Sequence, residues 1–325
     1  MGGLLAYSGL TTKIRAMQSR LLTQEQYASI VQLPTVTDVV EYLRRIPAYD
    51  RVLCDMTEEE LHRGKIERKL RHSIYMDFAK IYRFSNGEQR KFLDLYFKRY
   101  EIAIIKNWLN RLLDHRDILF PPTGFEEFFR KHSDLDLEKL TASATVEEFI
   151  ANLKGSDYYT PLIRLQRLEH PTLFDYEMAI DLYYFSQIWK QKDKFLKKKD
   201  LEEITLAYGS KFDIINIQWI YRCKKYYHMD STDIYALLIP VHFRLSPEMI
   251  TRLVEAENIE QFDALMKQTY YGQKFDKFSS ADLDNLYVFV MKRVLATESR
   301  RNPYSIATLY CYLYFKDHEV QRLTI

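Results

Sequence analysis

The same arrangement of polar and apolar positions occurs three times along the chain. Each copy begins with Thr or Asn, carries an acidic or amide side chain three residues later, and continues with apolar side chains four residues apart. The copies are TVTDVVEYLRRIPAY at 35–49, TVEEFIANLKGSDYY at 145–159 and NIEQFDALMKQTYY at 258–271. Thr and Asn cap helix starts by accepting backbone N–H groups, and the later side chain reaches back to the cap. The pattern predicts three short helices that begin after Thr35, Thr145 and Asn258.

Each predicted helix also carries an apolar stripe on one face. The stripes are Val39 with Leu43, Phe149 with Leu153, and Phe262 with Met266. One helix cannot bury such a stripe by itself. We therefore expect each capped helix to pack on another element of its own repeat.

A second, longer element recurs at helical spacing. Its copies are Tyr100-x-Ile102-x-x-Ile105-x-x-x-Leu109, Phe212-x-Ile214-x-x-Ile217-x-x-x-Tyr221 and Tyr304-x-Ile306-x-x-Leu309-x-x-x-Leu313. Spacings of three and four predict a long helix with an aromatic and aliphatic face. Further helical patterns cover 58–82 and 178–195. The expected fold class is all-α, with three similar helical-bundle repeats.

Helix-breaking residues suggest where the repeats join. The chain has 9 Gly and 9 Pro in 325 residues, which is few for a many-stranded protein. Two segments concentrate them: Phe120-Pro121-Pro122-Thr123-Gly124, and the stretch containing Pro240 and Pro247. Because Pro removes a backbone donor and Gly permits a reversal, we predict repeats at 1–119, 120–235 and 236–325.

Composition disfavours some classes of function but does not identify the function. Hydrophobic residues make up 47% and charged residues 28%, as in an ordinary globular chain, and the net charge is +2. This balance gives no general attraction to nucleic acid. Cys54, Cys223 and Cys311 are isolated, which fits a reducing cytoplasm. No apolar window is long enough to span a bilayer.

The sequence contains none of the common catalytic motifs. GxxxxGK[ST], GxGxxG, GxSxG and HExxH are all missing, and no histidines stand four residues apart. We therefore expect no enzymatic activity, no cofactor, no metal and no small-molecule substrate. The rival interpretation is an enzyme whose titratable groups converge from distant positions.

Two clusters of side chains have both a structural and a functional interpretation. The 25 Tyr and 19 Phe recur mainly at helical spacing, which favours core packing over base stacking. The run KQKDKFLKKK at 190–199 is a solvated helix end in one interpretation. In the other, it contacts an acidic partner or lipid headgroups.

Polar side chains also interrupt the second long helix, at Asp213, Asn216 and Arg222. A buried polar group without a partner costs about 1 to 3 kcal/mol. We therefore expect a satisfied polar contact between helices, and a direct contact with another protein of an assembly as the alternative.

At these residues the chain resembles the C subunit of the bacterial and archaeal V/A-type ATPases, the homologue of the d subunit in eukaryotic vacuolar ATPases. The resemblance covers the whole chain. It rests on diffuse motifs: Tyr7, Lys13-Ile14-Arg15-Ala16, Leu21-Leu22, Asp213-x-x-Asn216-Ile217 with Arg222, and Asn302-Pro303-x-x-Ile306-Ala307 with Tyr312, Lys316, Glu319, Val320 and Leu323.

The chain departs from the family pattern in two places. The first repeat has Glu101-Ile-Ala-Ile104 where the family has Asp-x-x-Asn, which puts that polar contact in doubt. Family members usually continue some residues past a segment like 322–325, where this chain stops.

The resemblance implies a funnel of three bundles in a pseudo-threefold arrangement, seated on the membrane rotor ring and holding the central stalk. It implies a non-catalytic rotor adaptor of a bacterial V/A-type ATPase, cytoplasmic and peripheral on the cytoplasmic face of the membrane. The coupled process is proton or sodium transport, or ATP synthesis. Arg222, Lys316 and Glu319 are the interface residues it suggests. The alternative is a helical scaffold of an unrelated complex.

Overall fold

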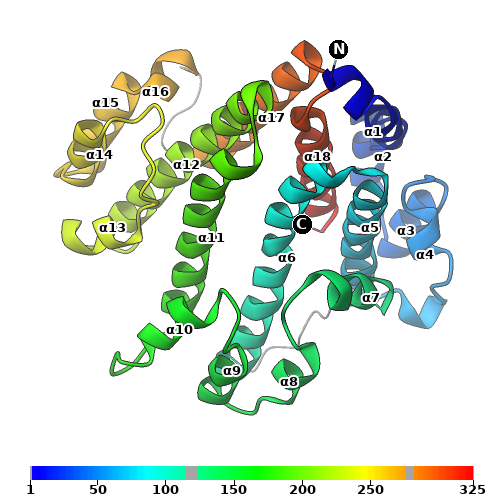
Figure 1. The fold of residues 1–325 in the computed structure, drawn as a ribbon, viewed down its shortest axis with the longest axis horizontal. Helices are drawn as coiled ribbons and strands as arrows, with labels where there is room; N and C mark the ends of the chain where they lie inside the picture. The colour runs from blue at the N-terminus through cyan, green and yellow to red at the C-terminus, as the bar shows by residue number, and fades with distance from the viewer. Residues whose placement is uncertain (1, 115–122, 276–281, 325) are drawn as a thin grey trace. The chain divides into compact units, whose positions relative to one another are not determined.

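The computed structural model describes residues 2–114, 123–275 and 282–324, and every regular element among them is helical (Figure 1). The all-α prediction is confirmed for these residues. The chain divides into two compact units. The first contains the residues up to Tyr159 together with those from Asn302 onward, and the second is Thr160–Arg301.

The first unit is built around α5, which packs against α1, α4, α7 and α18. Within this unit α9 also packs against α6 and α8. The helices are α1 (Gly2–Gln18), α2 (Gln24–Val31), α3 (Val36–Arg44), α4 (Asp50–Leu53), η1 (Glu58–Glu60), α5 (Arg63–Phe84), α6 (Gly87–Asp114), α7 (Thr123–His132), α8 (Leu137–Ala142), α9 (Val146–Asn152) and α18 (Ile306–Leu323).

The second unit is built around α12, which runs along α17 and also contacts α11, α13, α14 and α15 (Figure 1). Its helices are α11 (Leu173–Phe195), α12 (Lys198–Lys225), α13 (Ser231–Leu237), α14 (Pro247–Val254), α15 (Ile259–Gln268), α16 (Tyr270–Lys274) and α17 (Leu283–Arg301), and α10 (Tyr159–Leu165) begins at the last residue of the first unit.

The three predicted caps are confirmed. The side chains of Thr35, Thr145 and Asn258 accept the backbone N–H three residues later, at the starts of α3, α9 and α15. In α9 and α15 the side chain three residues after the cap accepts a different N–H group from the predicted one. Glu148 and Gln261 accept the backbone N–H of the residue before the cap, not of the cap itself.

The apolar stripes are buried in α9 and α15, but α3 is rotated slightly. Phe149 and Phe262 are fully buried, whereas Val39 is half-buried and its neighbour Val40 takes the buried place. The tyrosine that ends the pattern also comes one residue later in this copy, at Tyr49.

Each capped helix packs on another element within the predicted bounds of its repeat, as expected: α3 on α4, α9 on α8, and α15 on α14 and α16. With the predicted boundaries, α9 also packs on the long helix α6 of the preceding repeat, and α15 also packs on α12. In the second unit, Phe262 and Met266 join a core with Ile217 and Tyr221 of α12. A helix of 28 residues buries residues on several faces, so it can serve two bundles.

The predicted boundaries have no counterpart in the division into two units. The boundary at 119/120 lies outside the described residues, and the one at 235/236 falls inside α13. Pro247 instead occupies the first turn of α14 behind the cap Ser246, where its fixed φ and missing N–H suit a helix start. The division into three repeats stays a prediction.

Candidate functional site

Three buried contacts between a tyrosine and a carboxylate give the fold a recurring polar feature. Each tyrosine follows one of the three capped helices, and each carboxylate belongs to a long helix. The hydroxyl of Tyr271 donates to Asp213 at 2.9 Å, and that of Tyr158 donates to Glu101 at 2.5 Å. All six side chains are buried. The pairs are Tyr49 with Glu319, Tyr158 with Glu101, and Tyr271 with Asp213.

Each carboxylate also accepts a donor from the chain just before a short helix. Asp213 accepts the backbone N–H groups of Phe243 at 3.2 Å and Arg244 at 2.7 Å, shortly before α14. Glu101 accepts the hydroxyl of Ser133 at 2.5 Å, shortly before α8. Glu319 accepts the backbone N–H of Leu22 at 2.6 Å, shortly before α2.

The predicted polar contact at Asp213 and Asn216 is confirmed: Asp213 joins α12 to α16 through Tyr271, and both side chains also bind the loop before α14. Asn216 pairs with both main-chain polar groups of Ile239, donating to the carbonyl at 3.0 Å and accepting the N–H at 2.9 Å. Together the two side chains fasten residues 239–244 to α12. Gly209 completes the fit, because a Cβ there would lie 2.4 Å from the ring of Phe243.

Burial raises the pKa values of two of these carboxyl groups. For Asp213 the hydrogen bonds from Arg244, Tyr271 and Phe243 oppose the effect, and for Glu101 those from Ser133 and Tyr158 do so. Hydrogen bonds to the charged form favour that form, whereas loss of solvent disfavours it.

Glu319 and Lys316, two predicted interface residues, form a buried pair in α18. Their side chains are 4% and 1% exposed, and Lys316 Nζ lies 3.5 Å from Glu319 Oε1. The ammonium also lies 4.0 Å from the centre of the Tyr49 ring. Burial lowers the pKa of Lys316, and the charge of Glu319 opposes this. A partner would therefore reach this pair only through the residues that cover it.

Arg222, the third predicted interface residue, lies at the surface of the second unit. Its guanidinium bonds both oxygens of Asp284 at 2.8 and 3.0 Å, which ties α12 to α17. The two side chains are 49% and 74% exposed. Arg222 is thus accessible to a partner, although the role remains a prediction.

The lysine run lies at the turn between α11 and α12. Lys192 is buried, pairs with Asp193 at 2.9 Å and lies 4.3 Å from the centre of the Trp189 ring. The other five lysines of the run are exposed: Lys190, Lys194, Lys197, Lys198 and Lys199. Both interpretations of the exposed part, a solvated helix end and a contact with an acidic surface, stay open.

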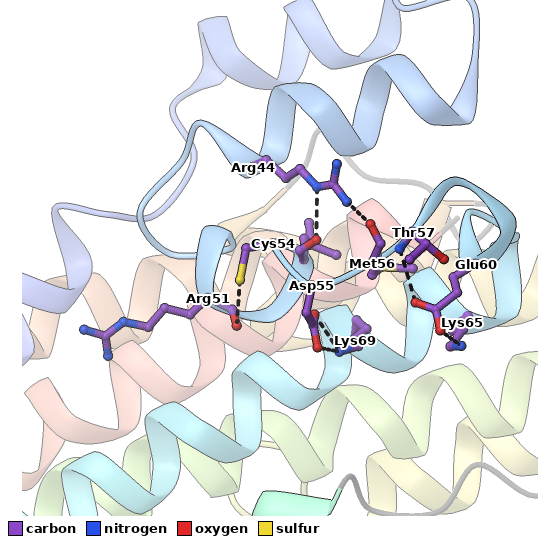
Figure 2. A network of polar contacts seen from close by, with 10 residues as sticks. Arg44, Arg51, Cys54, Asp55, Met56, Thr57, Glu60, Lys65 and Lys69 are labelled. Atoms are coloured by element: carbon purple, nitrogen blue, oxygen red, sulfur yellow. Dashed lines mark hydrogen bonds and ion pairs between the residues drawn. The ribbon is translucent and has the colours of Figure 1, made fainter.

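A further network holds the connection between α4 and α5 (Figure 2). Arg44 at the end of α3 donates to the main-chain carbonyl of Leu53 at 3.0 Å and to that of Met56. Lys69 of α5 pairs with Asp55 at 2.7 Å. These contacts position the residues that lead into α5.

The chemistry of the three contacts is structural. Each carboxylate is buried and has at least two donors, so it has little free capacity to act on a substrate. Among the described residues, no group of three or more His, Cys, Asp or Glu side chains is arranged to hold a metal ion. The contacts are suited to fastening helices.

The sequence pattern signalled the tyrosines but not their partners. Each copy of the capped pattern ends in Tyr, at Tyr49, at Tyr158-Tyr159 or at Tyr270-Tyr271. The match at Tyr304 put Ser305 at the position of the carboxylate, but Ser305 caps α18. In the register of the contacts, Glu319-Val320-x-x-Leu323 corresponds to Glu101-Ile102-x-x-Ile105 and Asp213-Ile214-x-x-Ile217.

Comparison with known proteins gives matches over nearly the full chain. The sequence profile of the ATP synthase (C/AC39) subunit family matches residues 10–325. The chain is 25% identical to the C subunit of the A-type ATP synthase of Methanosarcina acetivorans, covering 98% of this chain and 87% of that protein. It is 26% identical to the protein of the same name from Pyrococcus horikoshii, covering 98% and 84%.

Whether a helix can cross a membrane depends on its length and its hydrophobicity. None of the helices in the described part of the chain combines the length and the hydrophobicity that a bilayer crossing requires.

Proposed function

The chain belongs to the ATP synthase (C/AC39) subunit family, a family of non-catalytic subunits of a rotary complex, and from this premise we propose that it is a rotor adaptor. In this role it connects the central stalk of a V/A-type ATPase to the membrane rotor ring. It transmits torque between ATP chemistry in the head and ion movement at the ring. The observation that carries the proposal is the family match across residues 10–325.

The buried contacts support a mechanical role. A torque-transmitting protein must keep its helices in place under load. Hydrogen bonds to buried carboxylates are strengthened by the low local dielectric, and each of the three joins elements that are distant in sequence, such as Tyr49 and Glu319. Asp213 and Asn216 also hold residues 239–244 to α12 through main-chain hydrogen bonds, which keeps this segment in place.

The proposed partners are the central-stalk subunits and the proteolipid rotor ring, with the protein peripheral on the cytoplasmic face of the membrane. We expect the stalk contact to bury about 1,200 to 2,000 Å², the size of a standard specific interface. A funnel of three bundles would supply the concave face. The relatives from Methanosarcina and Pyrococcus are archaeal, so the bacterial origin is also part of the proposal.

The decisive experiment measures binding of the full chain to the central-stalk subunits of its own organism across a salt series. Arg222→Glu tests the exposed interface residue. Arg130→Glu is the matched control, because Arg130 is also exposed and ion-paired, with Glu138. Binding that weakens in Arg222→Glu alone supports both the adaptor role and the residue.

The possible outcomes test the adaptor role and the role of Arg222 separately. If the wild-type chain fails to bind the stalk even at low salt, the adaptor proposal falls. If it binds and the two variants behave alike, only the role of Arg222 falls. Restoring the chain to membranes depleted of it should restore ATP-driven ion transport, which a scaffold of an unrelated complex would not do.

A further inference from the structure

A small basic cavity lies within the first unit, and none of the six residues of the tyrosine–carboxylate contacts is part of its lining. Its volume is about 160 Å³. It is bounded by the end of α1 and the turn after it, by residues 47–52, by α5, and by one tyrosine of α18. The charged residues that line it are Lys13, Arg20, Arg51, Lys80 and Asp77.

The one carboxylate of this lining is already occupied. Tyr312 donates to Asp77 Oδ2 at 2.6 Å, and Lys80 donates to Oδ1 at 3.0 Å. Asp77 and Lys80 therefore offset each other's charge, and both carboxylate oxygens have donors. Neither oxygen is left as a principal partner for a further cation.

Three further cations line the cavity. Lys13, Arg20 and Arg51 form no ion pair with any residue that the structure describes. The ammonium of Lys13 lies 4.9 Å from the centre of the Phe84 ring, a contact that leaves its charge intact. The guanidinium of Arg51 extends away from the neighbouring polar network, which receives only its main-chain carbonyl (Figure 2).

The three cations come from both sides of the cavity. Lys13 lies in α1 and Arg20 in the turn just after that helix. Arg51 approaches from α4. Burial raises the pKa of Tyr312, and the nearby charge of Arg20 opposes this, which places Arg20 close to the Asp77 side of the cavity.

Small side chains keep the space between the cations open. Ala16, Ala48 and Ser73 are part of the lining, and none is long enough to fill it. The volume is several times what a single water requires but is smaller than the usual pocket of a drug-sized ligand. The cavity therefore suits one compact anionic group.

We propose that this cavity binds a phosphoryl group through Lys13, Arg20 and Arg51. Two guanidinium groups and an ammonium provide more donors and more charge than a carboxylate can use, whereas a phosphate has several terminal oxygens and up to two negative charges. The phosphoryl group can come from free phosphate or from the headgroup of an anionic phospholipid. The inference is independent of stalk binding.

The test uses the full chain with two probes, inorganic phosphate by calorimetry and phosphatidic acid vesicles by co-sedimentation. The test variant is Arg20→Gln with Arg51→Gln, and the control is Arg63→Gln with Arg130→Gln, which removes the same charge from exposed arginines outside the cavity. Arg20 and Arg51 are exposed, so the test variant should fold. Thermal unfolding checks this.

We expect the test variant to weaken phosphate binding by about tenfold or more, since each lost charge-assisted hydrogen bond contributes at least that factor. The control should differ little from the wild-type chain. Ala16→Glu should have the same effect as the test variant, because it places a carboxylate among the cations without removing one.

The two probes identify the source of the group. Binding of free phosphate, lost in the test variant, indicates a soluble ligand. Binding of phosphatidic acid vesicles alone, with phosphatidylcholine vesicles unbound and the same loss in the variant, indicates a lipid headgroup. The proposal is overturned if the wild-type chain binds neither probe at low ionic strength, or if the control loses as much binding as the test variant.

Discussion

Asp213 in α12 and Glu101 in α6 are both buried carboxylates that accept a tyrosine hydroxyl, but their other donors differ. Asp213 is reached by two main-chain N–H groups, from Phe243 and Arg244. Glu101 is reached by the side-chain hydroxyl of Ser133. The side chain of Glu101 is one methylene longer than that of Asp213. Glu101 accepts from a side-chain hydroxyl, whereas Asp213 accepts from the main chain.

The residues three positions after the two carboxylates, Asn216 and Ile104, also differ in hydrogen bonding. Asn216 pairs with both main-chain groups of Ile239, whereas Ile104 has no polar group to offer. The segment 239–244 is therefore fastened through its main chain, largely independently of its own side chains. The segment before α8 depends on one serine. The same tyrosine–carboxylate contact can thus be supported in a sequence-tolerant or in a sequence-dependent way.

The largest expected effect comes from removing the two carboxylates in turn. Asp213→Ala leaves two fixed N–H groups and a tyrosine hydroxyl without their acceptor, so we expect a loss of about 3 kcal/mol or more in the free energy of unfolding. Glu101→Ala leaves two hydroxyls that can rotate toward other acceptors, and we expect about half that loss.

Urea unfolding of both variants measures this difference. Glu41→Ala, at an exposed position of α3, is the control for losing a carboxylate. Equal losses in the two test variants would show that main-chain and side-chain donors are equivalent here, and the difference between Asp213 and Glu101 would have no energetic meaning.

The next effect isolates the amide of Asn216. Asn216→Ile gives the second unit the residue that the first unit has at Ile104. It leaves the N–H and carbonyl of Ile239 unpaired in a buried position, so we expect a loss of about 2 kcal/mol. Hydrogen exchange should speed up at Ile239. An unchanged exchange rate would mean that other contacts hold the segment.

The helix starts and the fold class were predictable because they depend on local chemistry. A cap and its acceptor are three residues apart, so Thr145 and Glu148 carry the whole signal for the start of α9. The buried apolar positions of the long helices also follow from spacing, as Ile105 and Ile217 show. These features need no knowledge of the rest of the chain.

The buried contacts were not predictable because they join distant segments. Tyr49 meets Glu319 almost at the opposite end of the chain, and spacing says nothing about such a pairing. The apolar spacing that begins at Tyr304 resembles that of the other two long helices. It aligns Ser305, and not Glu319, with the carboxylate position. The cavity around Arg20 and Arg51 likewise exists only once α1, α4 and α5 pack together.

A smaller effect should appear in the pH dependence of stability. Burial raises the pKa of Glu101 above 4.5 in the folded state. The folded chain then holds a proton that the unfolded chain releases, so this contribution to stability is complete below the unfolded pKa and is lost as the pH rises through the folded one. Glu101→Gln should make stability less dependent on pH in that window.

Thermal unfolding between about pH 4 and pH 7 tests this, a range that covers an ordinary and a raised carboxyl pKa. Asp213, whose pKa is also raised by burial, should leave the variant with part of the wild-type slope. Glu41→Gln serves as the exposed control. A variant with the full wild-type slope would show that Glu101 does not titrate there.

The smallest effect should come from the surface contact between Arg222 and Asp284, which joins α12 to α17 outside the buried network. Both side chains are largely solvated, and Gln218 also donates to Asp284 at 2.8 Å, so one donor remains when Arg222 is removed. Exposed ion pairs contribute about 0.2 to 1 kcal/mol, and salt screens them over about 10 Å at 0.1 M. Arg222→Ala should therefore cost about 0.5 kcal/mol at low salt and less at high salt, in urea unfolding beside Arg130→Ala as the control. A loss as large as that of Asn216→Ile would mean that solvent exposure does not decide which of these contacts stabilise the second unit, and the distinction between buried and surface fastening would have to be abandoned.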